Sequence, residues 1–442
     1  MINKIKFKLE LFFLFVKKNL LFIILGIIFG IFVNIFRDQV LAIYSNLTQT
    51  THYIGVEGLY TSKNLPYSIN QLITYGITTH TQNNKADISP IINSLDIQND
   101  NKDYLFTLKD NLYWHNNRRL EAKDIDLEIE GIEITPISSN QFKISLQKPF
   151  SPILSTLSQP LYLKNLVGLG PYKVKSIKYQ DSFIDFLKLE PKDSRLQKIT
   201  YKFYQNEKDL ISAFKLGEVD EIEISYLPQD ISTWPDISIN QTIDTTSKYI
   251  AIFLNTQKLE SKQLRQSLAY ATPKTKNKNE RCISPVSANS WAYNPSVKEY
   301  NFSASHAKEL IKDNQIEEIS LTVIDRRLLP TAEVIKKSWE DVLDIKVKIS
   351  VSPQVNPNFD AVLAFGGIPR DPDQYYFWHS TQTATNITKL NNSRIDKLLE
   401  EGRQTFDPQE RKRIYFDFQR YLLEESPAIF ISYPTYYNIS RK

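Results

Sequence analysis

The hydrophobic positions between residues 319 and 351 repeat with two different periods. Ile335, Trp339 and Leu343 fall at helical spacing, whereas the flanking runs 319–324 and 345–351 are short, apolar and rich in β-branched residues, as strands are. A strand, a helix and a second strand in this order predict two parallel strands joined by a right-handed crossover. This part of the chain is therefore expected to be α/β.

The same two periods divide much of the remaining chain into short elements. Strands are expected at residues 104–108, 141–146, 172–177, 199–204, 221–224, 249–255, 360–365 and 428–433. Helices are expected at residues 207–216 and 264–271, from about residue 393, and at 408–424. Asp407 before Pro408 matches the rules for a helix start, and Gly217 stands where a helix C-terminal glycine is expected. The Pro-, Ser- and Asn-rich residues 273–293 predict a loop.

Residues 375–378 are four consecutive aromatics, Tyr-Tyr-Phe-Trp. They follow an Asp371-Pro372 turn and precede a polar run at 380–388. In an extended segment, successive side chains point to opposite sides, so the four rings cannot all face one core. We therefore expect part of this ring surface to line a groove or cleft.

The N-terminal region contains an apolar run at residues 20–36, which is at the short end of what spans a bilayer. The lysines all precede this run, so the positive-inside rule places the N-terminus in the cytoplasm. A cleaved signal peptide is the alternative, although its apolar region is usually shorter. Under either interpretation the body of the protein lies outside the cytoplasm.

Charge and cysteine content narrow the function classes. The formal net charge is +4, and residues 1–38 alone carry an excess of four positive charges, so the rest of the chain sums to zero. A neutral body argues against nucleic acid as a partner, because phosphate binding depends on clustered cationic surface. The one cysteine, Cys282, has no partner for a disulfide, and no histidine lies near it in sequence to make it a nucleophile.

Several motifs, taken in order, resemble the family-5 extracellular solute-binding proteins, the oligopeptide and dipeptide receptors of ABC importers. Trp114, His115, Ala122 and Asp124 match the family's Trp-His-Asp-Gly turn and the helix start that follows, with Asn116-Asn117 in place of Asp-Gly. The other matching stretches are VGLGPYKV (167–174), LGEVDEIEI (216–224), YIAIFLN (249–255) and LRQSLAYA (264–271). No single motif decides the resemblance, which lies in the ordered set from about Tyr53 to Tyr433.

The resemblance implies a two-lobe periplasmic-binding-protein-like fold of type II, in which mixed α/β lobes are joined by hinge strands and preceded by one N-terminal transmembrane helix. The implied limits are a cytoplasmic basic segment at 1–19, the anchor at 20–36, lobe one with a shortened peripheral part at 51–247, lobe two at 248–425, and a return strand and tail at 426–442 packing toward lobe one. Ligand would be buried between the lobes by hinge closure.

The resemblance also suggests which residues bind ligand. The candidates are Tyr60, Phe365, Gly366, Trp378, Ser380 and Asn386, with Asn255 as a hinge residue. For Asn255, capping of the turn after its strand is an equal alternative. Peptide-binding members place an Asp that pairs with the ligand amine where this chain has Ile368. Either the ligand lacks a free amine there, or another carboxylate such as Asp371 or Asp373 has taken over, although Asp371 is expected to be mainly a turn residue.

The leading interpretation is a monomeric, single-pass membrane receptor that hands peptides or peptide-like small molecules to an ABC permease, with no catalysis, cofactor or metal site. A receptor of the same fold for a non-peptide ligand (a metal complex, haem, a sugar or another small molecule) is the alternative, and His379 beside Trp378 is the main support for the metal or haem form. An extracellular enzyme is less well supported, because the five histidines are scattered and no His-x-x-Glu-His or Gly-x-Ser-x-Gly pattern occurs. A sensor would need a cytoplasmic output domain, and only about twenty residues precede the apolar run.

Overall fold

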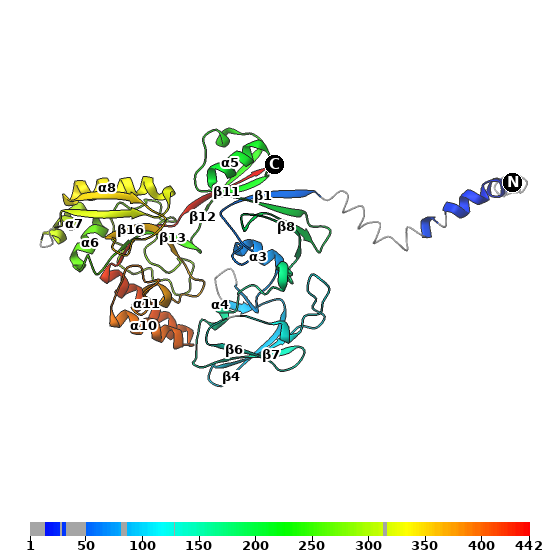
Figure 1. Cartoon of the computed structure of the whole chain (residues 1–442), viewed down its shortest axis with the longest axis horizontal. Helices are drawn as coiled ribbons and strands as arrows, with labels where there is room; N and C mark the ends of the chain where they lie inside the picture. Colours follow the sequence, from blue (N-terminus) through cyan, green and yellow to red (C-terminus); the bar gives the residue numbers. More distant parts are fainter. Residues whose placement is uncertain (1–13, 27–28, 32–49, 81–85, 128, 313–315) are drawn as a thin grey trace, which may run out of the picture.

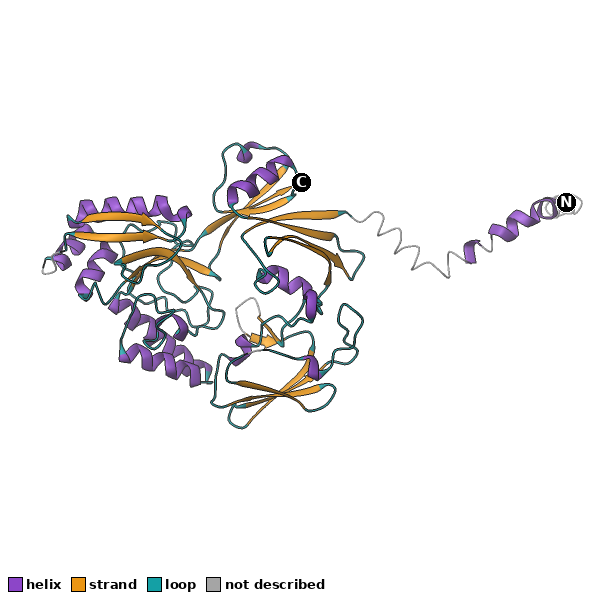
Figure 2. Ribbon diagram, viewed as in Figure 1, coloured by secondary structure: helices purple, strands orange, loops and turns teal. Residues whose placement is uncertain are grey.

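The computed structural model describes residues 14–26, 29–31, 50–80, 86–127, 129–312 and 316–442. Two lobes, each built on a mixed sheet, lie side by side, and the N-terminal helix stands apart from them (Figures 1 and 2). This helix, Leu14–Ile31, is long and apolar enough to cross a membrane, and none of its described residues is buried in the protein. Of the predicted anchor at 20–36, residues 27–28 and 32–36 lie outside the described residues.

Lobe one contains a seven-stranded sheet. Its strands, in spatial order, are β12 (Ile237–Ile243), β18 (Thr435–Arg441), β11 (Glu221–Ile224), β1 (Thr51–Glu57), β10 (Lys198–Tyr204), β9 (Phe183–Pro191) and β8 (Tyr172–Gln180). The central strand β1 pairs in parallel with β10 and β11, and the outer pairs are antiparallel. Helix α5 (Glu207–Leu216) packs on β1, β10 and β11, and α3 (Tyr67–Ile73) contacts β8.

A smaller part of lobe one is a four-stranded sheet of β4 (Ile92–Gln98), β5 (Asp103–Leu108), β7 (Gln141–Leu146) and β6 (Ile132–Pro136). It is accompanied by the hairpin of β2 (Thr78–His80) and β3 (Ala86–Ile88) and by the short helix α4 (Ile153–Thr156). The Trp114 indole is 1% exposed in this core, where it fills the corner of the turn. Asn117 in the same turn has a φ of 64°, a left-handed conformation that asparagine tolerates.

Lobe two is a five-stranded sheet flanked by helices. Its strands, in spatial order, are β15 (Lys346–Val351), β14 (Glu318–Val323), β16 (Ala361–Gly367), β13 (Lys248–Leu254) and β17 (Ala428–Ser432). Its helices are α6 (Lys262–Ala271), α7 (Ala304–Ile311), α8 (Leu329–Leu343), α9 (Tyr375–Trp378), α10 (Ser393–Gln404) and α11 (Pro408–Glu425). Strands β14 and β15 are parallel and connected through α8, as the hydrophobic pattern predicted. Short 3-10 turns occur at Ala122–Asp124, Lys164–Leu166, Ile231–Thr233 and Arg326–Leu328.

The chain crosses between the lobes at residues 244–247, between β12 and β13, and again at 433–434, between β17 and β18. The Asp244 carboxylate accepts hydrogen bonds from the backbone N–H groups of Thr246 (3.0 Å) and Ser247 (2.9 Å). The Asp244 N–H donates to the Pro434 carbonyl oxygen at 2.9 Å and so ties one crossing to the other.

The strand predicted at 428–433 exists, but as β17 it stays in the lobe-two sheet beside β13. The return to lobe one is made by β18, which pairs with β11 and β12. The sequence analysis did not recognise β18 as a strand. Its sequence mixes polar and apolar residues and has no continuous apolar run, and its polar side chains are at most half-buried. The strands on either side of it therefore decide its position in the sheet.

Two contacts hold the lobes against each other at opposite ends of their interface. The Arg327 guanidinium of lobe two forms an ion pair with Glu57 of lobe one at 2.9 Å. At the other end, the Ser151 N–H of lobe one donates to the carbonyl oxygen of Arg403, in α10 of lobe two, at 2.7 Å. The lobes are therefore in direct contact in this structure.

A third contact joins the lobes through Arg370, which follows β16. Its guanidinium carbon lies 3.3 Å from the centroid of the Tyr67 ring on α3, and its Nη1 donates to His80 Nδ1 at 3.2 Å. His80 Nε2 lies 3.3 Å from the Ser155 hydroxyl. Burial and the Arg370 charge lower the pKa of His80 to about 4.

The His80 contact predicts a pH dependence of stability. An unfolded-state histidine has a pKa of about 6.5, so between about pH 6.5 and 4 the unfolded chain binds a proton that the folded chain excludes. The free energy of unfolding should therefore fall with decreasing pH through this window, and the fall should be smaller in His80→Gln. Urea unfolding at several pH values measures both slopes. His306→Gln, at a half-buried position away from the lobe contact, is the control substitution. Equal slopes in wild type and His80→Gln would contradict the prediction.

Candidate functional site

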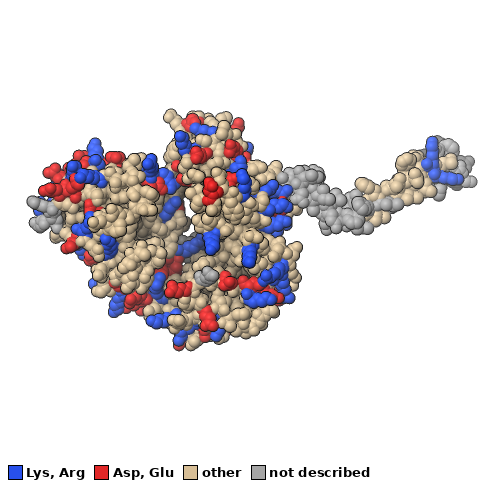
Figure 3. Space-filling view, viewed as in Figure 1, with Lys and Arg blue, Asp and Glu red and all other residues tan. Residues whose placement is uncertain are grey.

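A cavity of about 510 Å³ lies where the lobes meet, and the molecular surface is hollowed there (Figure 3). Its walls come from β1, β10, β11, β12 and β18 of lobe one, from α3 and from the 244–248 crossing, and Arg327 reaches it from lobe two. Residues from both lobes therefore line one space, and both crossings lie beside it.

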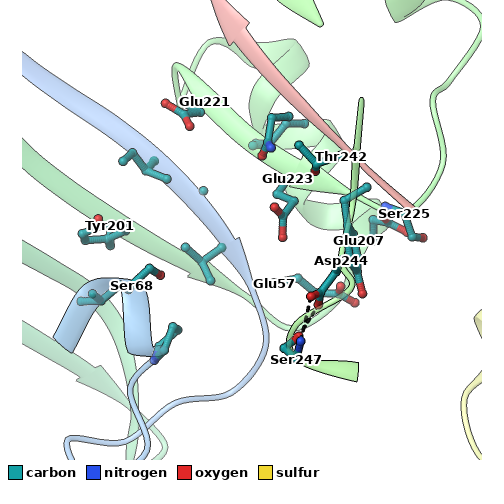
Figure 4. A pocket seen from close by; sticks show the side chains of 18 of the residues that line it. Glu57, Ser68, Tyr201, Glu207, Glu221, Glu223, Ser225, Thr242, Asp244 and Ser247 are labelled. Carbon is teal, nitrogen blue, oxygen red and sulfur yellow. Dashed lines mark hydrogen bonds between the residues drawn. The ribbon is translucent and has the colours of Figure 1, made fainter. Parts of the chain in front are cut away.

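Strand β11 explains why the floor of this cavity is acidic. Its sequence alternates Glu-Ile-Glu-Ile, and successive side chains of a strand face opposite sides of a sheet. Ile222 and Ile224 pack into the core beneath α5, so Glu221 and Glu223 face the cavity (Figure 4).

Most of the cavity carboxylates already have partners in the protein. Glu57 pairs with Arg327, and Glu207 accepts from the Ser225 hydroxyl at 2.9 Å. Glu221 lies 2.9 Å from the His52 ring nitrogen.

Glu223 differs from its neighbours, since within the described residues its carboxylate has no hydrogen bond or ion pair. Burial, followed by the charges of Asp244 and Glu221, raises the pKa of Glu223, although Lys248 opposes this. The Glu223 side chain is exposed in the cavity. The cavity therefore offers an unpaired carboxylate that a positively charged group of a ligand can reach.

Two cations face the acidic floor. Lys248 Nζ lies 5.2 Å from the centroid of the Phe365 ring and 5.0 Å from that of Tyr436. The Arg327 guanidinium carbon lies 5.7 Å from the same Phe365 ring. A second cavity, of about 610 Å³, is lined by Phe365 and shares Arg327 and Tyr436 with the first. The arrangement can hold a ligand that carries both charges next to aromatic surface.

Tyr60 and Phe365 are the two predicted residues that the structure brings to this region. Tyr60 lines the first cavity, and its hydroxyl donates to the Glu57 carbonyl oxygen at 3.2 Å. Phe365 lines the second cavity under Lys248 and Arg327. Their role in binding ligand stays a prediction.

Trp378 is placed in the lobe-two core and lines neither cavity. Its indole is 1% exposed, and its Nε1 donates to the Gln374 side-chain oxygen at 3.1 Å. The expected extended geometry of the aromatic run is wrong, because Tyr375–Trp378 forms the helical turn α9. A helical turn directs the rings around an axis rather than to two sides, so Trp378 points inward while Tyr376 is 55% exposed.

Ser380 and Asn386 also make contacts within lobe two. The Ser380 hydroxyl and N–H donate to the Asp396 carboxylate at 2.6 and 2.9 Å, which fastens the segment to α10. Asn386 is 3% exposed, and its amide donates to the Leu390 carbonyl oxygen at 2.8 Å. These hydrogen bonds order the loop between α9 and α10.

Gly366 and Asn255 both have structural roles within lobe two. A Cβ on Gly366 would lie 2.3 Å from the Tyr249 ring, so this β16 position accepts only glycine without rearrangement. The Asn255 amide donates to the Phe359 carbonyl oxygen at 2.9 Å and its oxygen accepts from the Gln257 N–H at 3.2 Å. Asn255 stands at the end of β13 away from both crossings, and its bonds match the turn-capping alternative.

Ile368 is 9% exposed, and the carboxylates near it in sequence are occupied. Asp371 forms a bidentate pair with Arg411, at 2.6 and 2.9 Å, and also accepts from the Asp373 N–H, as a turn residue does. Asp373 pairs with Arg403 at 2.9 Å. Neither carboxylate faces the two cavities.

The sequence analysis missed Lys248, Arg327 and Glu223. The signal for Glu223 was present, because the alternation in β11 shows that its two glutamates share a face opposite the isoleucines. Lys248 and Arg327 carried no comparable signal. Lys248 begins β13 and Arg327 lies in the 3-10 turn Arg326–Leu328 after β14, and only the tertiary packing brings the two together.

The burial of Trp378 makes a measurable prediction. Trp378→Ala should reduce the free energy of unfolding by about 3–5 kcal/mol, because it leaves a large cavity in the lobe-two core. Chemical denaturation gives this value, and Tyr376→Ala at the exposed position of the same turn should cost less than about 1 kcal/mol. A stable Trp378→Ala protein with weakened ligand binding would instead assign the indole to a binding site.

Comparisons with known proteins agree with this geometry. The nickel-binding protein NikA of Staphylococcus aureus is 22% identical over 393 residues, covering 74% of this chain and 76% of the relative. The dipeptide-binding protein of Escherichia coli is 20% identical over 473 residues, covering 84% and 85% of the two chains. Both are similar to this chain over most of its length.

Solved structures confirm the two-lobe periplasmic-binding-protein-like fold. NikZ from Campylobacter jejuni, in complex with Ni(L-His), superposes with a TM-score of 0.75 at 22% identity and covers 89% of this chain and 94% of its own. AppA from Bacillus subtilis, in complex with a nonapeptide, gives a TM-score of 0.72 at 17% identity, with coverage of 89% and 95%. The sequence model described as bacterial extracellular solute-binding proteins, family 5 Middle, matches residues 127–388. The chain therefore belongs to the bacterial extracellular solute-binding proteins of family 5.

Proposed function

We propose that this protein captures peptides or peptide-like small molecules between its lobes and delivers them to an ABC permease. The observation that carries the proposal is the cavity of about 510 Å³ lined by residues of both lobes beside both crossings. The unpaired Glu223 carboxylate and the Lys248 ammonium suit the two ends of a zwitterion, and Tyr60 and Phe365 supply apolar surface. The proposal involves no catalytic step.

A complex of a metal ion with an amino acid is the second candidate ligand. NikZ from Campylobacter jejuni and NikA from Staphylococcus aureus are related in fold and were solved with nickel–histidine complexes. Such a complex also carries both charges, so the same cavity would receive it. His379 gives this candidate no support, because it is 3% exposed and its ring nitrogens face Thr381 and Glu400.

We further propose that the protein is a monomer held at the membrane by its N-terminal helix, with the N-terminus in the cytoplasm and the lobes outside. The helix Leu14–Ile31 and the lysines that precede the apolar run support this topology. We propose the domain limits 1–19, 20–36, 51–247, 248–432 and 433–442. The crossings at 244–247 and 433–434 support the limits between the lobes, and the last one is moved from 425 because β17 belongs to the lobe-two sheet.

The experiment is to purify the full chain in mild detergent and identify co-purifying molecules by native mass spectrometry. Thermal shift with a short-peptide library and with nickel–histidine then follows. Short peptides in the native spectrum and a raised melting temperature support the proposal. A response to nickel–histidine alone would replace peptides by metal complexes as the proposed ligand class. A protein that binds neither ligand would contradict the proposed function.

Lys248→Met should weaken binding of the identified peptide by about 10- to 100-fold, because one charge-assisted hydrogen bond in a poorly solvated cavity contributes about 1.5–3 kcal/mol. Isothermal titration calorimetry measures the change. Lys258→Met is the matched control, since Lys258 pairs with Asp360 away from the cavity. Equal affinities for wild type and Lys248→Met would remove Lys248 from the site.

A further inference from the structure

The outer face of strands β8, β9 and β10 in lobe one carries a cluster of lysines. Along β9, Leu187 and Leu189 point into the core, so Lys188 between them points outward. Lys202 of β10 and Lys178 of β8 both stand opposite the same outward β9 position, Phe186. We call this surface the lysine face; its members are Lys173, Lys175, Lys178, Lys188, Lys198 and Lys202.

The lysine face is the source of a marked charge asymmetry in the body. Residues 172–204 contain eight lysines and arginines and four aspartates and glutamates, whereas the chain from residue 39 onward sums to zero. Figure 3 shows Lys and Arg side chains gathered on lobe one beside the point where the N-terminal segment joins it. A surface of this kind attracts anionic partners.

Only some of these lysines are neutralised within the protein. Lys173 and Lys175 lie 3.5 and 3.4 Å from the Glu190 carboxylate, so two cations share one anion. Lys178 pairs with Asp185 at 3.0 Å.

For Lys188, Lys198 and Lys202, no carboxylate among the described residues lies within ion-pair distance. Lys202 instead lies 5.6 Å from the centroid of the Tyr53 ring. Tyr53 is 38% exposed and Tyr179, at the end of β8, is 49% exposed. Tyrosine rings mixed with lysines are typical of surfaces that meet the headgroup region of a bilayer.

Among possible anionic partners, the position of the N-terminal helix favours the membrane. Strand β1 begins at Thr51, which is the register partner of Lys198 in β10. The nineteen residues between Ile31 and Thr51 can extend to at most about 70 Å, so a membrane-inserted helix keeps lobe one near the bilayer. A tether of this length raises the effective concentration of the lipid surface at the face.

We propose that the lysine face docks lobe one on anionic lipid headgroups of the membrane that holds the N-terminal helix. This inference rests on the membrane-anchored part of the proposed function and is independent of the ligand. Docking through lobe one does not involve lobe two, whose described chain connections to lobe one run through residues 244–247 and 433–434. The attraction acts over about one Debye length, about 8 Å at physiological salt, and therefore weakens as salt is added.

The test uses the full chain reconstituted into vesicles, with a fluorophore on a single introduced cysteine. Cys282 does not compete for the label, because it is fully buried and burial raises the pKa of its thiol to about 12. Ser176→Cys places the donor beside Lys188, and Val334→Cys on α8 places it on lobe two as the control. Energy transfer to headgroup-labelled lipid is compared between phosphatidylcholine vesicles and vesicles of equal parts phosphatidylcholine and phosphatidylglycerol.

We expect transfer from Ser176→Cys to rise at least twofold in the anionic vesicles and to return to the phosphatidylcholine value at high salt. Transfer from Val334→Cys should not rise. The double reversal Lys188→Glu with Lys202→Glu should abolish the increase, and the matched reversal Lys308→Glu with Lys312→Glu on α7 should leave it intact. Thermal unfolding confirms that each variant is folded.

Equal transfer in the two kinds of vesicle, or an increase that survives the Lys188→Glu and Lys202→Glu reversal, would overturn the proposal and leave an acidic protein surface as the occupant of the lysine face. Flotation with phosphatidylcholine vesicles reports on the helix separately. A chain that floats only with anionic vesicles, and only at low salt, would contradict the anchor while supporting the lipid-binding face.

Discussion

The paired crossings at 244–247 and 433–434 are the constraint on which the rest of the structure depends. The Asp244 carboxylate fixes the first crossing through the N–H groups of Thr246 and Ser247, and the Asp244 N–H binds the Pro434 carbonyl oxygen of the second. At this point the chain passes from one sheet to the other twice, and the two crossings lie side by side. The cavity forms beside these crossings, with β11 and β12 on one side and Arg327 on the other.

The electrostatics of the cavity follow from this arrangement. Arg327 of lobe two pairs with Asp325 of its own lobe and with Glu57 of lobe one, the latter at 2.9 Å, so its charge is already balanced within the protein. Lys248, at the start of β13, lies between the acidic floor and the Phe365 and Tyr436 rings. Glu223 is left without a partner among the described residues and has a raised pKa. A carboxylate with a perturbed pKa that lines a cavity is a candidate for binding a ligand.

Local patterns were sufficient for most of the secondary structure. Helix α5 and strands β7 and β11 have the bounds that the hydrophobic period predicted, and Asp407 caps α11 by accepting from the N–H groups of Gln409 and Glu410. The family resemblance was carried by such short motifs in order, and the match over residues 127–388 confirms it. Two elements were not predicted correctly, and both lie in short segments whose local pattern is misleading. The aromatic run at 375–378 folds as one helical turn, and β18 lacks the apolar run that would mark it as a strand.

The sequence by itself determined the class of fold, the apolar N-terminal helix and the neutral charge of the body, because these depend on periodicity and composition along the chain. Only the tertiary structure decided which side chains share a space. Trp378 was expected in a cleft and lies in a core, whereas Arg327 and Lys248, about eighty residues apart, meet over Phe365. The physical reason is that a strand fixes which face a side chain takes, but the element packed against that face is set by how distant strands join into sheets.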